Sequence, residues 1–191
     1  MPGMRAVLAI IIFCGSIHVN AERYLTQEEF LRTAFMPDSF SMKQLWLDAA
    51  HKKIALDILG HEYRPLRVRY WKQKQKTAWM LDEIGKEQPI TLGIVINAGK
   101  IETLQVIEYR EMRGGEIRHR FFTEQFRTSS LTPDLQLSRT VDTISGASLS
   151  VSAATKVSRL ALYFHSAVCP QQENLPTDQL QRSLEKGKAK K

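Results

Sequence analysis

The sequence predicts an α+β fold with a mostly antiparallel sheet, two N-terminal helices and a C-terminal helix that follows a loop of small residues. Three observations lead to this prediction. Apolar residues alternate with polar ones over short stretches between residues 66 and 109, as they do in half-buried strands. The flanking segments instead repeat apolar residues at helical spacing. Short turns separate the strand candidates, which favours antiparallel pairing.

Two helices are expected before the strands. Residues 25–35 predict a short helix that is capped by Thr26 and has acidic residues in its first turn. Residues 41–59 predict a longer helix capped by Ser41, because several apolar residues would share one face. Those residues are Leu47, Ala50, Ile54 and Ile58.

Four strands are expected next. The candidates are residues 66–72, 76–84, 90–96 and 101–109. The turn Asn97-Ala98-Gly99-Lys100 joins the last two into a hairpin. The fourth candidate carries apolar residues on both faces, which indicates a central place in the sheet.

Aromatic and helical segments follow the strands. Phe121, Phe122 and Phe126 fall in a short helical segment and are expected in the core. A long helix is expected from Ser148 to about Ala167, with Lys156 and Arg159 on its outer side. Its buried stripe would consist of Ala153, Val157, Leu160, Phe164 and Val168.

The composition is that of a globular protein with one domain and extensions. The chain has 191 residues, 43% of them hydrophobic and 25% charged, and a formal net charge of +7. No basic motif is interleaved with aromatic residues, so no nucleic-acid partner is expected. We predict a signal peptide at 1–21, a helical and strand extension at 22–76, a main domain at 77–168 and a basic disordered tail at 169–191.

The first residues predict export. Arg5 precedes a continuous apolar run over residues 6–13, and Val19-Asn20-Ala21 offers a cleavage site. The run is shorter than the roughly 20 residues that a spanning helix needs, although an uncleaved anchor is the alternative. Cleavage would leave Cys169 as the only cysteine, so no disulfide could form within the chain. The expected location is the periplasm or the outer face of the cytoplasmic membrane.

The most informative stretch is Asp142-Thr143-Ile144-Ser145-Gly146-Ala147-Ser148, which opens directly into the last helix. Ser148 would therefore lie at or beside a helix N-terminus, where unpaired N–H groups and the helix dipole favour a phosphate. The alternative is a simple turn in which serine caps the helix.

This stretch resembles the motif D-x-x-[ST]-G-A-[TS] of the FMN-binding domain family, which includes the covalent flavoproteins NqrC and RnfG of respiratory membrane complexes. Asp142, Ser145, Gly146, Ala147 and Ser148 occupy the specified positions, and Thr143 lies between them. The resemblance covers residues 79–165 approximately. It implies that FMN is linked to Ser148 through a phosphoester, which a flavin transferase forms from FAD with magnesium. Family members often have threonine at the acceptor position, whereas this chain has serine.

A second loop resembles the family as well. Family members often have a Glu–x–x–Gly loop near the flavin after the same hairpin, and Glu111 and Gly114 occupy the comparable places. The family's Pro-Gly pair is replaced by Arg113-Gly114. The alternative is that residues 110–116 form an ordinary solvated turn.

The resemblance implies an exported single-domain flavoprotein that relays electrons and is not a complete enzyme by itself. Its partners would be the flavin transferase and a redox protein, such as a membrane-bound or haem-containing electron-transfer complex. Two other functions remain open: a secreted basic binding module without flavin, and a flavin-dependent reductase. No metal-ligand spacing and no Ser-His-Asp or Cys-His constellation occurs in the sequence, so we expect neither a metal site nor a catalytic nucleophile.

Overall fold

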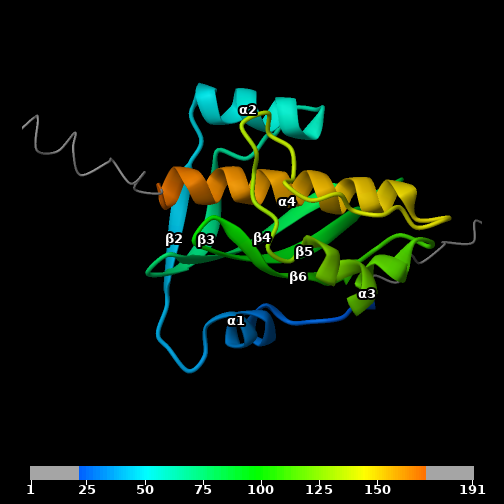
Figure 1. The fold of residues 1–191 in the computed structure, drawn as a ribbon, viewed down its shortest axis with the longest axis horizontal. Helices are drawn as coiled ribbons and strands as arrows, with labels where there is room; N and C mark the ends of the chain where they lie inside the picture. The colour runs from blue at the N-terminus through cyan, green and yellow to red at the C-terminus, as the bar shows by residue number, and fades with distance from the viewer. Residues whose placement is uncertain (1–21, 171–191) are drawn as a thin grey trace, which may run out of the picture.

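The computed structural model describes residues 22–170. The predicted signal peptide and nearly all of the predicted basic tail lie outside the described residues. The described chain has an α+β fold with a six-stranded antiparallel sheet and four α-helices. The sheet is sandwiched between helices that cover both of its faces (Figure 1).

The sheet contains all four predicted strands and two more. Its strands lie in the order β1-β6-β5-β4-β3-β2, and every neighbouring pair is antiparallel. The predicted turn is confirmed, because only Ala98 and Gly99 separate β5 from β6 and both have positive φ, as a tight hairpin requires. The strands are β1 (Glu22–Arg23), β2 (Ser41–Trp46), β3 (Arg67–Gln73), β4 (Lys76–Ile84), β5 (Pro89–Asn97) and β6 (Lys100–Tyr109).

The helices form layers around the sheet (Figure 1). The long helix α4 lies along one face, which we call the α4 face, and α2 packs on the outer side of α4. Helix α1 covers part of the opposite face, which we call the α1 face. The α-helices are α1 (Gln27–Phe35), α2 (Ala49–Leu59), α3 (Arg120–Thr123) and α4 (Ser148–Val168), and two short 3-10 helices, η1 (Gly115–Arg118) and η2 (Glu124–Phe126), flank α3.

The predicted helix over residues 41–59 is wrong in its first half. Ser41–Trp46 forms strand β2, and α2 begins only at Ala49. The cap is Asp48, whose side chain accepts the backbone N–H of His51 at 2.8 Å, and not Ser41. The physical reason is that pairing with β3 satisfies backbone groups of Ser41–Trp46 along the full length of the strand. By contrast, the Thr26 cap is confirmed, with a capping box to Glu29.

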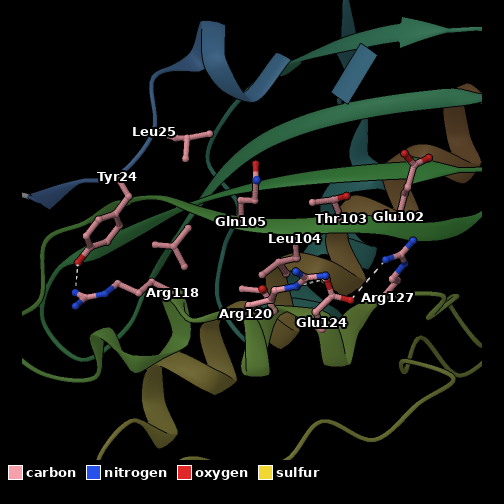
Figure 2. Close-up of a pocket in the computed structure, with 12 residues that line it drawn as sticks. Tyr24, Leu25, Glu102, Thr103, Leu104, Gln105, Arg118, Arg120, Glu124 and Arg127 are labelled. Atoms are coloured by element: carbon pink, nitrogen blue, oxygen red, sulfur yellow. Dashed lines mark hydrogen bonds and ion pairs between the residues drawn. The ribbon is translucent and has the colours of Figure 1, made fainter. Parts of the chain in front are cut away.

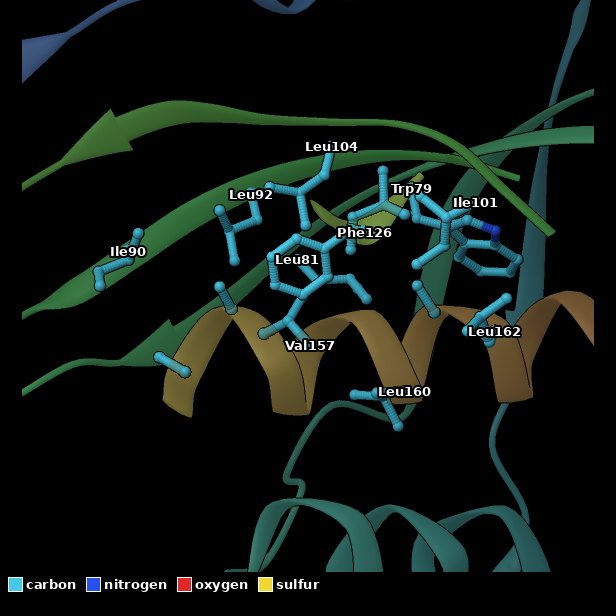
Figure 3. Close-up of a cluster of buried hydrophobic side chains, with 14 of the residues drawn as sticks. Trp79, Leu81, Ile90, Leu92, Ile101, Leu104, Phe126, Val157, Leu160 and Leu162 are labelled. Carbon is cyan, nitrogen blue, oxygen red and sulfur yellow. The ribbon is translucent and has the colours of Figure 1, made fainter. Parts of the chain in front are cut away.

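The main core lies between the α4 face and α4. Figure 3 shows Leu81, Leu92 and Leu104 of the sheet on the side that faces Val157 of the helix, and Trp79 further along, near Leu162. All these side chains are almost completely buried. The predicted α4 stripe is buried except at Val168, which is half-buried. Of the predicted aromatic core, Phe122 and Phe126 are fully buried but Phe121 is 61% exposed. This core fixes the start of α4 over one end of the sheet.

Candidate functional site

Ser148 is the first residue of α4, and its side chain is exposed. The residue at the N-cap position is Ala147, and no side chain caps the helix. The interpretation of Ser148 as a cap is therefore wrong. Because the first N–H groups of a helix have no partner within it, the first turn of α4 offers backbone donors beside an exposed hydroxyl. The positive end of the helix dipole adds to the attraction for an anion.

The loop before Ser148 is small and tightly turned. Gly146 has φ +81°, which glycine adopts without steric cost, and beyond its two chain neighbours no residue has an atom within 4 Å of the place where a Cβ would stand. The Ala147 N–H donates to the Ile144 carbonyl at 2.9 Å, and Ala147 is buried. The predicted site residues Thr143 and Ser145 are exposed. A second protein can therefore approach the Ser148 hydroxyl from the side of Gly146.

Asp142 positions this loop through its backbone. Its N–H donates to Oε1 of Gln125 at 2.8 Å, which ties the loop to η2. The Asp142 carboxylate is exposed and accepts no hydrogen bond from any residue between 22 and 170. The side chain therefore remains free for contact with another molecule, and Gln125 is a loop-positioning residue that the sequence reasoning missed.

Glu111 lies at the same end of the sheet and holds the β4–β5 turn. Its Oε1 accepts the backbone N–H groups of Lys86, Glu87 and Gln88 at 2.5, 2.7 and 2.9 Å. Partial burial raises the pKa of Glu111, but these three donors outweigh it and hold the pKa below its usual value. Glu111 therefore links the loop after β6 to the β4–β5 turn.

Gly114 lets this second loop pack against the start of α4. It has φ +89°, and a Cβ there would stand 2.7 Å from Ser150 Oγ and 2.8 Å from Tyr109 Oη. The Tyr109 hydroxyl donates to the Arg113 carbonyl at 2.5 Å, so the Ser150 hydroxyl, 2.9 Å away, must donate to Tyr109. Tyr109 and Ser150 were not predicted as site residues, because 41 positions separate them in the sequence.

A groove of about 660 Å³ joins these parts and has the size of a small-molecule site. Apolar Met112 and Leu149 are 85% and 53% exposed along it. Lys86, Arg110 and Arg113 supply positive charge, although Arg110 also pairs with Glu108 at 2.8 Å. The groove is lined by residues 86–88, 110–113 and 146–150. It therefore combines backbone donors and cations for a phosphate with apolar side chains for an aromatic ring, and its chemistry fits FMN.

Two other cavities lie away from Ser148. Figure 2 shows one of about 510 Å³ between Tyr24, strand β6 and the α3 region, where Arg120 and Arg127 share Glu124. A groove of about 970 Å³ contains His61, whose Nε2 lies 2.9 Å from Oε1 of the buried Glu83. Neither cavity contains a residue of the predicted flavin site.

The part of the chain that the structure describes contains neither a metal-binding cluster nor a membrane-spanning helix. Between residues 22 and 170, no group of three or more histidine, cysteine, aspartate or glutamate side chains is arranged to hold a metal ion. No helix in this range is both long and apolar enough to cross a lipid bilayer.

Comparison with known proteins gives one family. The model of the FMN-binding domain family matches residues 85–163, which include β5, β6, both loops of the groove and most of α4. No significant match was found among curated proteins or among solved structures. The matched segment contains Glu111, Gly114 and the whole Asp142–Ser148 stretch. The match over residues 85–163 therefore supports the resemblance to the FMN-binding domain family that the Asp142–Ser148 motif predicted.

Proposed function

We propose that this protein is an extracytoplasmic electron-transfer flavoprotein that carries FMN on Ser148 through a phosphoester bond. At the family level, the FMN-binding domain indicates flavin binding and electron transfer. The observation that carries the finer proposal is the position of Ser148: an exposed hydroxyl on the first residue of an uncapped helix, inside a groove that suits the flavin.

A separate flavin transferase supplies the catalytic groups for the attachment reaction. The Ser148 oxygen bonds to the phosphorus that bears the riboflavin half of FAD, the bond from that phosphorus to AMP breaks, and AMP leaves. The serine proton passes to a base of the transferase, because a hydroxyl is a weak nucleophile until it is deprotonated. Magnesium in the transferase would stabilise the charge on the leaving AMP. Gly146 and Ala147 carry small side chains or none, so an enzyme's active site can reach Ser148.

The groove residues then hold the product. The backbone N–H groups of the first turn of α4, with Lys86 and Arg113, would face the phosphate. Met112 and Leu149 would contact the isoalloxazine and exclude water from one side of it. The bound flavin supplies one- and two-electron chemistry, and the protein adjusts its potential through these contacts.

The proposed location and partners follow from the sequence. The signal-like residues 1–21 support export, and a covalent link suits a compartment in which a lost cofactor could not be replaced from a local pool. The proposed partners are the transferase and a redox protein at or in the membrane. The exposed apolar edge at Met112 would bring such a partner close to the ring.

The experiment is co-expression with a flavin transferase, followed by denaturation, in-gel flavin fluorescence and intact-mass measurement. We expect the wild type to fluoresce and to carry the mass of one FMN. Ser148→Ala should lose both signals, whereas Ser148→Thr, which keeps the hydroxyl, should retain them. Ser145→Ala is the matched control, because Ser145 is an exposed serine of the same loop.

The position of Ser148 explains why Ser148→Ala should leave the fold intact. Ser148 makes no cap contact, and alanine is a better helix former than serine by a few tenths of a kcal/mol, about 0.5 at most. A fluorescent denatured Ser148→Ala band would show that flavin is attached elsewhere. A wild-type chain without added mass, when a known acceptor is loaded by the same transferase, would refute the covalent link.

A further inference from the structure

Strand β2 exposes an unpaired edge with large apolar side chains. It is the last strand of the sheet, and among residues 22–170 only β3 pairs with it. Its outward N–H and C=O groups are therefore available to another strand. Met42 and Trp46 on this strand are 54% and 64% exposed, and Lys43 is its only charged residue. Apart from Lys43, this edge has none of the charges, prolines or bulges that normally prevent strand addition.

The side chains of this edge are already ordered on the α1 face. The Arg67 guanidinium lies over the Trp46 ring, 5.4 Å from its centroid, and donates to Gln44 Oε1 at 3.0 Å. Met42, Gln44 and Trp46 alternate along the strand and so share one face. Apolar side chains thus lie two positions before and two positions after Gln44. An antiparallel copy of the strand, centred on Gln44, would present an apolar side chain opposite each of them.

We propose that a second copy of this chain pairs with this edge, so that β2 of one copy runs antiparallel to β2 of the other with Gln44 at the two-fold axis. In this register Met42 lies opposite Trp46 of the second copy, and this pair occurs twice. Lys43 lies opposite Leu45, so no like charges face each other directly. Cross-strand pairs of this kind are the unit from which sheets gain stability.

The neighbouring symmetric registers are worse. Centring the pair on Lys43 places the two lysines directly opposite each other, which destabilises a strand pair. Centring it on Leu45 moves Met42 away from Trp46 and leaves half of β2 without a strand residue opposite it. The Gln44-centred register alone joins the exposed apolar residues and separates the charges.

The opposite edge of the sheet limits the assembly to two copies. Strand β1 has two residues, Glu22 and Arg23, both charged and exposed. So short an edge offers little backbone for a further strand, whereas the β2 contact uses the same surface on both copies. A contact of this isologous kind closes on itself and gives a dimer instead of a filament.

Sedimentation equilibrium of the purified protein over a range of concentrations tests the proposal. We expect a reversible dimer whose dissociation constant rises about tenfold or more in Met42→Lys and in Trp46→Lys, because each change removes both symmetric pairs. Leu56→Lys is the matched control: Leu56 is 46% exposed but lies on α2, so the dimer should not change. Circular dichroism of each variant establishes that it is folded.

Disulfide cross-linking tests the register independently of those variants. In a chain with Cys14 and Cys169 replaced by alanine, Gln44→Cys should form a covalent dimer, because opposed Cα atoms are about 4.5–5.5 Å apart. Lys43→Cys should not, since each cysteine would lie about 7–8 Å from its counterpart. Three results would each overturn the proposal: a monomer at every concentration, a dimer that both lysine variants leave unchanged, or equal cross-linking at the two positions. If a lysine variant is unfolded, the cross-linking result decides.

Discussion

His165 should make the stability of this protein depend on pH in a window below neutrality. Its ring is 1% exposed, and Nε2 accepts the Gly99 N–H at 3.1 Å, so this nitrogen carries no proton. Nδ1 lies 2.7 Å from the Thr77 hydroxyl oxygen, which also accepts the Trp79 indole N–H at 2.8 Å. Burial, with a smaller contribution from the charge of Lys72, lowers the pKa of His165 from 6.5 to about 4.

The sign and size of the effect follow by linkage. Between the two pKa values the unfolded chain binds a proton that the folded chain excludes, so the free energy of unfolding falls as the pH drops from about 6.5 to about 4. A difference of about 2.5 pKa units corresponds to roughly 3 kcal/mol, all of it retained above neutral pH. His61 acts in the opposite direction, because its hydrogen bond to Glu83 raises its pKa and its contribution is lost as the pH rises.

Urea unfolding of the wild type and of His165→Gln at several pH values isolates this residue. Glutamine keeps an acceptor for the Gly99 N–H but does not titrate. We expect the wild type to lose roughly 3 kcal/mol more than the variant between about pH 7 and pH 4. Parallel stability curves for the two proteins would refute the assignment of His165 as a neutral buried ring.

The other predictions concern the two loops of the groove. Gly114→Ala should destabilise the fold by about 2–3 kcal/mol in urea unfolding, from positive φ plus the contacts with Ser150 and Tyr109. Gly60→Ala, at φ +78° with no atom within 4 Å, should cost only about 1–2 kcal/mol, and equal losses would contradict the contact argument. Glu111→Gln should weaken three hydrogen bonds and speed amide exchange at residues 86–88, whereas the control Glu87→Gln should not. Unchanged amide exchange in Glu111→Gln would show that Glu111 does not hold the β4–β5 turn in place.

Local patterns in the amino-acid sequence determined much of the fold. The alternation of Ile90, Leu92, Ile94 and Ile96 and the Asn97–Lys100 turn predicted the β5–β6 hairpin, because half-buried strands and tight turns leave signals within a few residues. The apolar residues at helical spacing after Ser148 likewise predicted the last helix, α4. The motif from Asp142 to Ser148 led to the family that the match over residues 85–163 then confirmed.

Tertiary structure decided what depends on distant partners. Residues 41–46 form a strand because the edge of β3 supplies partners for their backbone hydrogen bonds. The local sequence of residues 41–46 does not indicate that this partner is present. The groove exists because the β4–β5 turn and the end of β6 meet at one end of the sheet, under the first turn of α4. Glu111 holds one of those segments and Tyr109 holds another, through contacts that span 23 and 41 positions. The sequence alone therefore determined which hydroxyl stands at the helix start, whereas long-range packing decided which side chains surround it.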